Sequence, residues 1–315
     1  MIDFRYHLVS LIAVFLAIAL GIVIGTTALN EPILADIKNQ VSDLEGDKRS
    51  LEDRTQQLQA QLDTTEAFEE AVAPALVDGT LSGDSVLLVV TNEDVPPETV
   101  DQVTALIGEA GGTITGTLNL RPEYSDPSSA SALQGYVTGS GLPTGVQLPE
   151  VDDAGQLVGA LLAQVLMIPP DGVAPDGVAI SSVLAGLSAL DVLTPGGDSI
   201  APADYAVVLT AGEFSGEDAA ERSQTVAELV AALDTAGSGA VVAGDAASAA
   251  ENGLVGVIRA DPNLSAAVST VDNVNSTAGA ISTVLALGQE GEGTSGKYGT
   301  GEDTQPVPPV PPATP

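Results

Sequence analysis

The sequence contains no cysteine, no tryptophan and a single histidine, His7. The lack of cysteine excludes disulfides, thiolate metal sites and cysteine nucleophiles together. One histidine excludes a His–His metal pair within one chain and argues against a Ser-His-Asp triad. Aromatic residues make up only 3% of the chain, so alanine, valine, leucine and isoleucine must build the core. We therefore expect no enzymatic activity.

Basic residues are also scarce. Nine lysines and arginines face 43 acids, which gives a formal net charge of −34. Such a surface repels nucleic acid and anionic lipid headgroups, so no nucleic-acid partner is expected. The acidity is typical of a soluble surface that resists aggregation. A length of 315 residues allows one or two domains besides an anchor.

Long apolar runs are rare, but one occurs at the N-terminus. Residues 8–29 carry no charge, and about 20 such residues span a bilayer as a helix. Arg5 precedes the run, whereas Glu31 and Asp36 follow it. The positive-inside rule then predicts a cytoplasmic N-terminus, with everything after the helix outside the cytoplasm.

A cleaved signal peptide is the alternative to this single-pass anchor. Thr26-Thr27-Ala28 resembles a small-residue cleavage site. The apolar run is longer than the core of a signal peptide and the basic segment before it is thin. These features favour an uncleaved cytoplasmic end and transmembrane helix over residues 1–31.

Small residues recur at every fourth position of the predicted span. Such a strip, which includes a GxxxG motif, lets two helices approach closely in lipid. The alternative is a chance pattern in a segment rich in glycine and alanine. The predicted helix-dimer face is Ala13, Ala17, Gly21 and Gly25.

A heptad pattern follows over residues 32–72, after a predicted helix start at Asn30-Glu31-Pro32. It predicts a coiled-coil stalk and, with the small-residue strip, a parallel homodimer. A single amphipathic helix that folds back on the soluble domain is the alternative. Polar residues interrupt the pattern at Lys48, Thr55 and Thr65. The predicted coiled-coil core is Leu34, Ile37, Val41, Leu44, Leu51, Leu58 and Leu62.

Residues 80–288 alternate between strand and helix patterns. One unit has strands at 84–91 and 113–118 around a helix that ends near Ala110, and a second has strands at 204–210 and 240–243. Continuous β-branched runs of this kind are typical of buried parallel strands. The pattern predicts an α/β fold with a parallel sheet, as one sheet or two lobes.

The remaining elements are less regular. Further helices are expected at 154–167, 215–235 and 275–287, and a further strand at 253–259. Stretches near 122–149 and 169–178 are rich in proline and glycine and are expected to be loops. Residues 289–315 end in a polyproline run and are expected to form a disordered tail.

Ligands of open α/β sheets bind at the carboxyl ends of the strands. No glycine-rich nucleotide fingerprint follows any predicted strand. Carboxylates at these ends predict a weak candidate site for a hard divalent cation, with ordinary solvated loop acids as the alternative. The candidate ligands are Glu93, Asp94, Glu213 and Asp245, beside Asn92.

Three stretches of sequence resemble a known family. They are the opening Met1–Gly25, the run Ser269-Thr270-Val271-Asp272-Asn273-Val274 that leads to Gly279, and Gly296-Lys297-Tyr298-Gly299. All three resemble the actinobacterial copper transport family called MctB, described as outer membrane proteins. The resemblance spans most of the chain and is strongest at the N-terminus.

The resemblance implies a role in copper transport and in keeping intracellular copper low, within the cell envelope. It also implies an outer-membrane, channel-forming protein, but one helical span does not make a transmembrane barrel. Apart from copper, which only the resemblance implies, no cofactor is evident. The soft or imidazole ligands that copper prefers are limited to Met1, Met167 and His7.

The residues themselves also support a second hypothesis. A transmembrane helix, a predicted stalk and an α/β region would form a membrane-anchored dimeric module with a structural or interaction role. Its partners would be other envelope proteins, and it would have no direct metal role.

Overall fold

A computed structural model describes residues 4–139, 142–143, 145–170, 172–197 and 199–310, without the side chains of residues 26–36. The chain forms two units, Met1–Thr65 and Glu66–Pro315. Each unit is described by itself below.

Helix α1 extends over Phe4–Val77. Its residues up to Thr65 form the first unit, and its last residues, from Glu66, belong to the second unit. The separate helix start expected at residues 30–32 is not observed, because α1 runs through Pro32 without interruption. A proline inside a helix costs about 3 kcal/mol through one lost backbone hydrogen bond and a steric clash. The long segments on both sides keep their own hydrogen bonds, so the helix continues.

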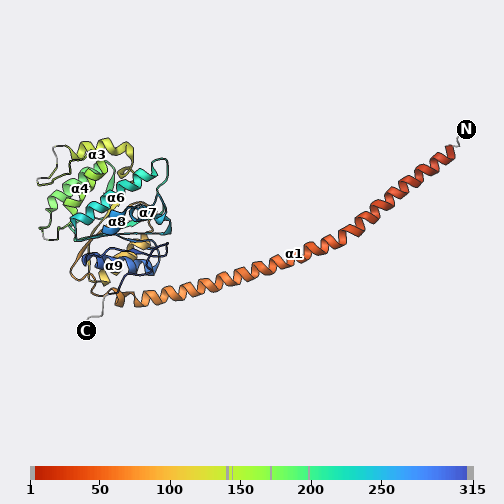
Figure 1. Ribbon diagram of the computed structural model, residues 1–315, viewed down its shortest axis with the longest axis horizontal. Helices are drawn as coiled ribbons and strands as arrows, with labels where there is room; N and C mark the ends of the chain where they lie inside the picture. Colours follow the sequence, from red (N-terminus) through yellow and green to blue (C-terminus); the bar gives the residue numbers. More distant parts are fainter. Residues whose placement is uncertain (1–3, 140–141, 144, 171, 198, 311–315) are drawn as a thin grey trace. The chain divides into compact units, whose positions relative to one another are not determined.

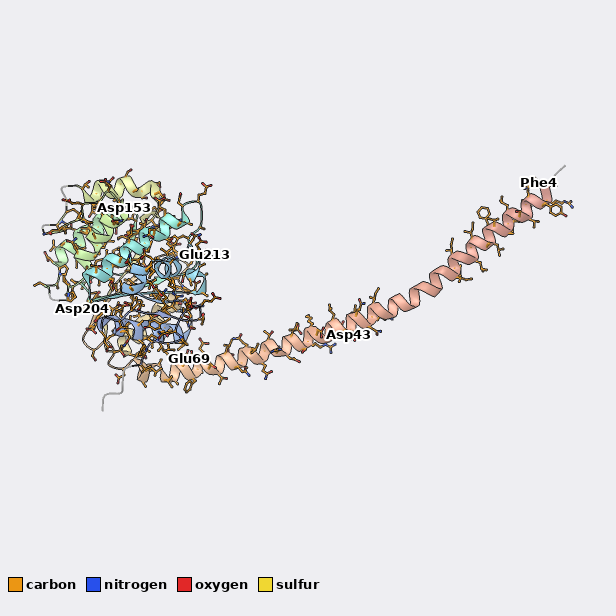
Figure 2. All side chains as sticks on the ribbon, viewed as in Figure 1. Phe4, Asp43, Glu69, Asp153, Asp204 and Glu213 are labelled. Carbon is orange, nitrogen blue, oxygen red and sulfur yellow. The ribbon has the colours of Figure 1, made fainter. Side chains whose placement is uncertain are left out.

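The first part of α1 is long and apolar enough to cross a membrane. Phe4–Gly25 has a mean hydropathy of 2.9, and none of it is buried within the structure. Side chains such as Phe4 and Asp43 project from α1 in Figure 2. Phe4 is 78% exposed. Apolar side chains at such exposure need cover from lipid or from another chain.

The second unit contains one mostly parallel sheet, which answers the question of one sheet or two lobes. Its strand order is β3-β2-β1-β4-β5-β6-β7. Only β3 is antiparallel to its neighbour among the described strands. The strands are β1 Ser85–Val90, β2 Thr113–Leu120, β3 Leu193–Pro195, β4 Tyr205–Thr210, β5 Ala240–Gly244, β6 Ser269–Val271 and β7 Lys297–Tyr298.

Helices cover both faces of this sheet (Figure 1). One layer contains α3 Ala130–Val137, α4 Ala154–Leu166, α5 Gly177–Ala189, α6 Ala219–Ala236, α7 Leu254–Ala260 and α8 Pro262–Ala267. The other contains α2 Pro97–Glu109, α9 Thr277–Gly291 and the end of α1. Short 3₁₀ helices lie at Pro122–Tyr124, Pro127–Ser129 and Ala246–Ala249.

Side chains of the central strands β1, β4 and β5 alternate between these two layers. In β1, Leu87 and Val89 contact the layer that contains α4. Val86, Leu88 and Val90 contact the layer that contains α9. Side chains of a strand point to opposite faces in turn, so both faces of a doubly covered sheet must be apolar. This requirement explains the continuous Val/Leu/Ala runs of the sequence.

Several predicted elements differ from the structure. The strand expected at 253–259 is helix α7, because Leu254, Val255 and Ile258 share one buried helical face. The expected loops at 122–149 and 169–178 include α3 and the start of α5. Within the stretch expected to be a disordered tail, α9 continues through Gly291 and β7 joins the sheet beside β6. Residues 311–315 lie outside the described part of the chain.

Carboxylates hold the first residues of three parallel strands. The carboxylate of Asp204 accepts a hydrogen bond from the backbone N–H of Ser85, at the start of β1, over 2.9 Å. At the start of β5, the Asp234 carboxylate accepts from Ala240 N–H over 3.0 Å. At the start of β6, the Glu290 carboxylate accepts from Ser269 N–H over 2.7 Å. The amino edge of the sheet is thus satisfied by the protein's own acids.

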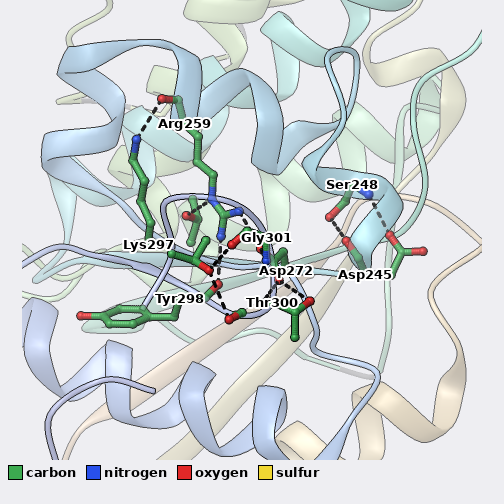
Figure 3. A network of polar contacts seen from close by, with 11 residues as sticks. Asp245, Ser248, Arg259, Asp272, Lys297, Tyr298, Thr300 and Gly301 are labelled. Carbon is green, nitrogen blue, oxygen red and sulfur yellow. Dashed lines mark hydrogen bonds and ion pairs between the residues drawn. The ribbon is translucent and has the colours of Figure 1, made fainter. Parts of the chain in front are cut away.

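A buried ion pair fastens the C-terminal segment to β6 and α7 (Figure 3). The Arg259 guanidinium lies 2.7 Å from the Asp272 carboxylate, and their side chains are 12% and 1% exposed. Arg259 also donates to the Tyr298 carbonyl, and Asp272 accepts from the N–H groups of Thr300 and Gly301. Burial raises the pKa of Asp272, but these hydrogen bonds outweigh it and hold the pKa below its usual value.

This ion-pair network occupies two of the stretches that carry the family resemblance. Residues 269–274 supply Asp272, and residues 296–299 supply Tyr298 and Gly299. Gly299 has φ +126°, and a Cβ there would collide with the Asp272 carboxylate. A glycine is therefore required beside the buried carboxylate, and these stretches serve the fold.

Two acids at the amino edge, the buried Glu290 and the half-buried Asp234, predict a pH-dependent contribution to stability. Burial raises the pKa of Glu290 to about 7 and that of Asp234 to about 6. The folded protein binds these protons more tightly than the unfolded chain, so the stability that these two groups contribute is largest at low pH and is lost as pH rises toward 7. Glu290→Gln keeps an acceptor for Ser269 N–H and removes the charge. The difference in the free energy of unfolding between variant and parent should shift by about 1 kcal/mol or more in favour of the variant when the pH rises from 5 to 8.

The measurement is urea unfolding of the full chain in detergent, followed by far-UV circular dichroism at both pH values. Glu292→Gln is the matched control, because this exposed carboxylate follows the same helix end. An equal shift for the two variants, or none for Glu290→Gln, would contradict the assignment.

Candidate functional site

The described surface of the second unit contains a cleft of about 290 Å³ at the carboxyl edge of the sheet. Residues 91–94 after β1, residues 121–125 after β2 and residues 213–215 after β4 line it, together with Arg222 of α6. Strand β2 lies on one side of β1, and β4, which comes later in the sequence, lies on the other side. The strand order therefore changes direction between β1 and β4. Open α/β sheets bind their ligands at such a switch point.

Two arginines line the cleft. Arg222 Nε donates to the Ser125 hydroxyl over 3.4 Å, and its guanidinium lies 5.6 Å from the centre of the Phe214 ring. Arg222 has no ion pair among the described residues, although hydrogen bonds from Ser128 and, to a smaller extent, the Arg222 charge lower the pKa of Asp126. Arg121 Nε lies 3.2 Å from Asp191, but the N–H is not aligned for a hydrogen bond.

Two further polar groups of the cleft have no hydrogen-bond partner within the described part of the chain: the Thr91 hydroxyl and the side-chain carbonyl of Asn92. The Tyr124 hydroxyl is also without a partner there, but it lies near Glu228 and Asp153, which do not line the cleft. Thr91 is 5% exposed and Tyr124 is 2% exposed. Burial, with Glu228 and Asp153 nearby, raises the pKa of Tyr124, so the phenol keeps its proton. Buried polar groups normally have hydrogen-bond partners, so these atoms can form hydrogen bonds with a ligand or with water.

Three of the four predicted acidic residues line the same cleft. Glu93, Asp94 and Glu213 are exposed at its rim, whereas the arginines are half-buried. The rule that ligands bind beyond strand ends therefore predicted the edge of the sheet at which the cleft lies. The cleft differs from the expected cation site because arginines share it.

Asp245 is engaged elsewhere. Its carboxylate accepts from the backbone N–H groups of Gly212 and Ser248, each over 2.9 Å, and so fixes the loops after β4 and β5 (Figure 3). No group of three or more His, Cys, Asp or Glu side chains able to hold a metal ion occurs within residues the structure describes. The four acids do not come together as one cation site.

Arg121, Arg222 and Tyr124 line this cleft but were not predicted from the sequence. One signal for the arginines was available, because residues 66–315 contain only four bases, Arg121, Arg222, Arg259 and Lys297. Arg259 and Lys297 belong to the ion-pair network. The two remaining bases of this unit both reach one cleft.

The predicted dimerisation residues lie along α1. Ala13, Ala17 and Gly21 are exposed, and a Cβ added at Gly21 or Gly25 would meet no described atom within 4 Å apart from the neighbouring helix backbone. The Leu34 side chain is outside the described part of the helix. The other predicted core residues are 50% to 73% exposed: Ile37, Val41, Leu44, Leu51, Leu58 and Leu62.

Comparison with known proteins identifies relatives along the whole chain. The family model described as "Copper transport outer membrane protein, MctB" matches residues 1–309. The protein named copper transporter MctB of Mycobacterium tuberculosis (strain ATCC 25618 / H37Rv) is 35% identical over 312 residues, 98% of this chain and 99% of the relative. Its namesake in Mycobacterium leprae (strain TN) is 34% identical over 309 residues, 96% of this chain and 97% of the relative. The match confirms the resemblance read from the sequence, and the chain belongs to the MctB family of copper transport proteins.

Proposed function

We propose that this protein is a cell-envelope component that keeps intracellular copper low. The observation that carries this proposal is family membership over residues 1–309, in a family described by copper transport. Relatives that carry the name copper transporter are similar over nearly their whole length. The proposal concerns copper handling as an outcome for the cell and leaves the transport step to be assigned.

The residue inventory favours an indirect role in copper handling. Copper prefers thiolate, thioether or imidazole ligands. The chain has no cysteine, Met167 is 1% exposed, and His7 lies near the start of the apolar part of α1. Met1 lies outside the described residues. We infer that partner proteins in the envelope supply the copper ligands and the pore.

The orientation of the anchor is part of the proposal. Arg5 precedes the apolar segment, whereas Glu31 and Asp36 follow it with only Lys38 as a nearby base. This distribution favours a cytoplasmic N-terminus and an extracytoplasmic second unit. An uncleaved helix with this orientation favours the cytoplasmic membrane, although the family description says outer membrane.

A second candidate function is a membrane-anchored dimeric module with a structural or interaction role. The exposed leucines of α1 favour it, because Leu44 and Leu51 are 73% and 66% exposed in a single chain. Pairing of two parallel helices at these positions would bury them. In this case the protein would organise envelope partners without a metal role.

The copper proposal is tested by the copper content of cells. A deletion strain, its parent and the complemented strain are grown in elevated copper, and cell-associated copper is measured by mass spectrometry. We expect the deletion strain to accumulate copper and the gene to restore the parental level. Zinc in the same samples is the control. Equal copper in all strains would remove the copper role and leave the interaction module as the leading function.

The orientation is tested by labelling, which the cysteine-free chain makes simple. A membrane-impermeant maleimide is applied to intact cells that carry either Ser50→Cys or Ile2→Cys. We expect labelling of the first variant in intact cells and of the second only after lysis, on a chain of full length. Loss of the position-2 label from the mature protein would mean that the segment is a cleaved signal peptide.

The dimer is tested by sedimentation of the full chain in detergent. Gly21→Leu and Gly25→Leu, combined with Leu44→Asp and Leu51→Asp, should abolish self-association, because they block close approach and charge the predicted core. The matched control is Ser50→Asp with Gln57→Asp, which adds the same charge at outward heptad positions. A dimer that survives the first set of substitutions would refute both pairing motifs.

A further inference from the structure

The cleft at the carboxyl edge of the sheet concentrates positive charge in an acidic protein. Arg121 and Arg222 line it, although the second unit has only four bases in total. Both side chains are half-buried. Arg121 Nε lies 3.2 Å from the Asp191 carboxylate, whereas Arg222 has no ion pair among the described residues. A half-buried guanidinium in a cleft favours a carboxylate or phosphate group, which it can bind through two parallel hydrogen bonds.

Polar groups that line the cleft supply further contacts. Thr91 offers a hydroxyl and Asn92 offers a carbonyl oxygen, both without partners in the described residues. The Asn92 amide nitrogen already donates to the Ala211 carbonyl over 2.8 Å, which fixes the orientation of this side chain. The unpartnered carbonyl oxygen can therefore only accept a hydrogen bond, so it favours a ligand that also carries an N–H or O–H donor.

The rim has the opposite charge. Glu93, Asp94 and Glu213 are exposed around the mouth of the cleft. Three carboxylates there repel a ligand that carries only negative charge, and no glycine-rich turn cradles a phosphate. They attract an ammonium group at the outer end of a ligand whose anionic group is bound deeper.

We propose that this cleft binds a zwitterion of amino-acid or dipeptide size. The ligand carboxylate lies between Arg121 and Arg222, and its ammonium group lies near the rim acids. A volume of about 290 Å³ is at the lower end of the range for ligand pockets, which matches such a small molecule. This site is independent of the copper role.

The test is isothermal titration of the full chain in detergent micelles with L-alanyl-L-alanine, glycine and L-alanine. Two blocked dipeptides separate the charges: N-acetyl-L-alanyl-L-alanine lacks the ammonium group and L-alanyl-L-alanine amide lacks the carboxylate. We expect saturable binding of at least one zwitterion and weaker binding of both blocked forms. Arg222→Gln should weaken binding about tenfold or more, because a charge-assisted contact is lost.

Arg54→Gln is the matched control, since it removes the same charge from α1, outside the second unit. Circular dichroism checks the fold of each variant. If Arg222→Gln does not fold, Thr91→Val removes the unpartnered hydroxyl with little change in shape and should also weaken binding. The proposal is overturned if no zwitterion binds at millimolar concentration, or if binding is unchanged in a folded cleft variant. Inorganic phosphate that binds through Arg222 while the zwitterions do not would make the cleft a simple anion site.

Discussion

The second unit depends on one constraint: its parallel sheet is covered by helices on both faces, so polar chemistry is confined to the two edges where strands begin and end. At the amino edge, Asp204, Asp234 and Glu290 accept hydrogen bonds from the first residues of three strands. The protein's own carboxylates thus bind these backbone N–H groups at the amino edge. The carboxyl edge remains open at the switch point between β1 and β4, where Thr91 and Asn92 have unpartnered polar atoms. The division of roles between the edges follows from the strand direction, which is the same for six of the seven described strands.

The same constraint explains what the sequence could predict. Strands β1, β4 and β5 are continuous apolar runs that are recognisable because both of their faces are buried. Strands β6 and β7 have three and two residues, too few for any periodicity, and they depend on long-range pairing. Helix α7 was mistaken for a strand because Val255, Val257 and Ile258 are β-branched. In a short segment tertiary packing overrides that preference.

The cleft shows where local reasoning ends. The acids Glu93, Asp94 and Glu213 were predicted because they directly follow strands. Arg121 escaped the same rule because the strand was expected to end at residue 118, whereas β2 continues to Leu120. Arg222 comes from the first turns of α6, and only the folded chain brings it to Ser125, 97 positions earlier in sequence. The scarcity of bases in residues 66–315 marks both arginines as unusual, but no spacing in the sequence indicates that they line the same cleft.

Membership in a copper transport family and the chemistry of this chain point to different levels of function. The family motifs of the C-terminal half build the network around Asp272 and Gly299, which fastens β7 to the sheet. They support the fold and contain no sulfur or imidazole ligand for copper. The N-terminal motif forms the apolar part of α1. This part is a candidate membrane span, and the C-terminal motifs keep the sheet intact. Under the proposed copper role, residues that act in this way influence metal transport through what the protein positions, while the cleft lined by Arg121 and Arg222 supplies separate polar chemistry.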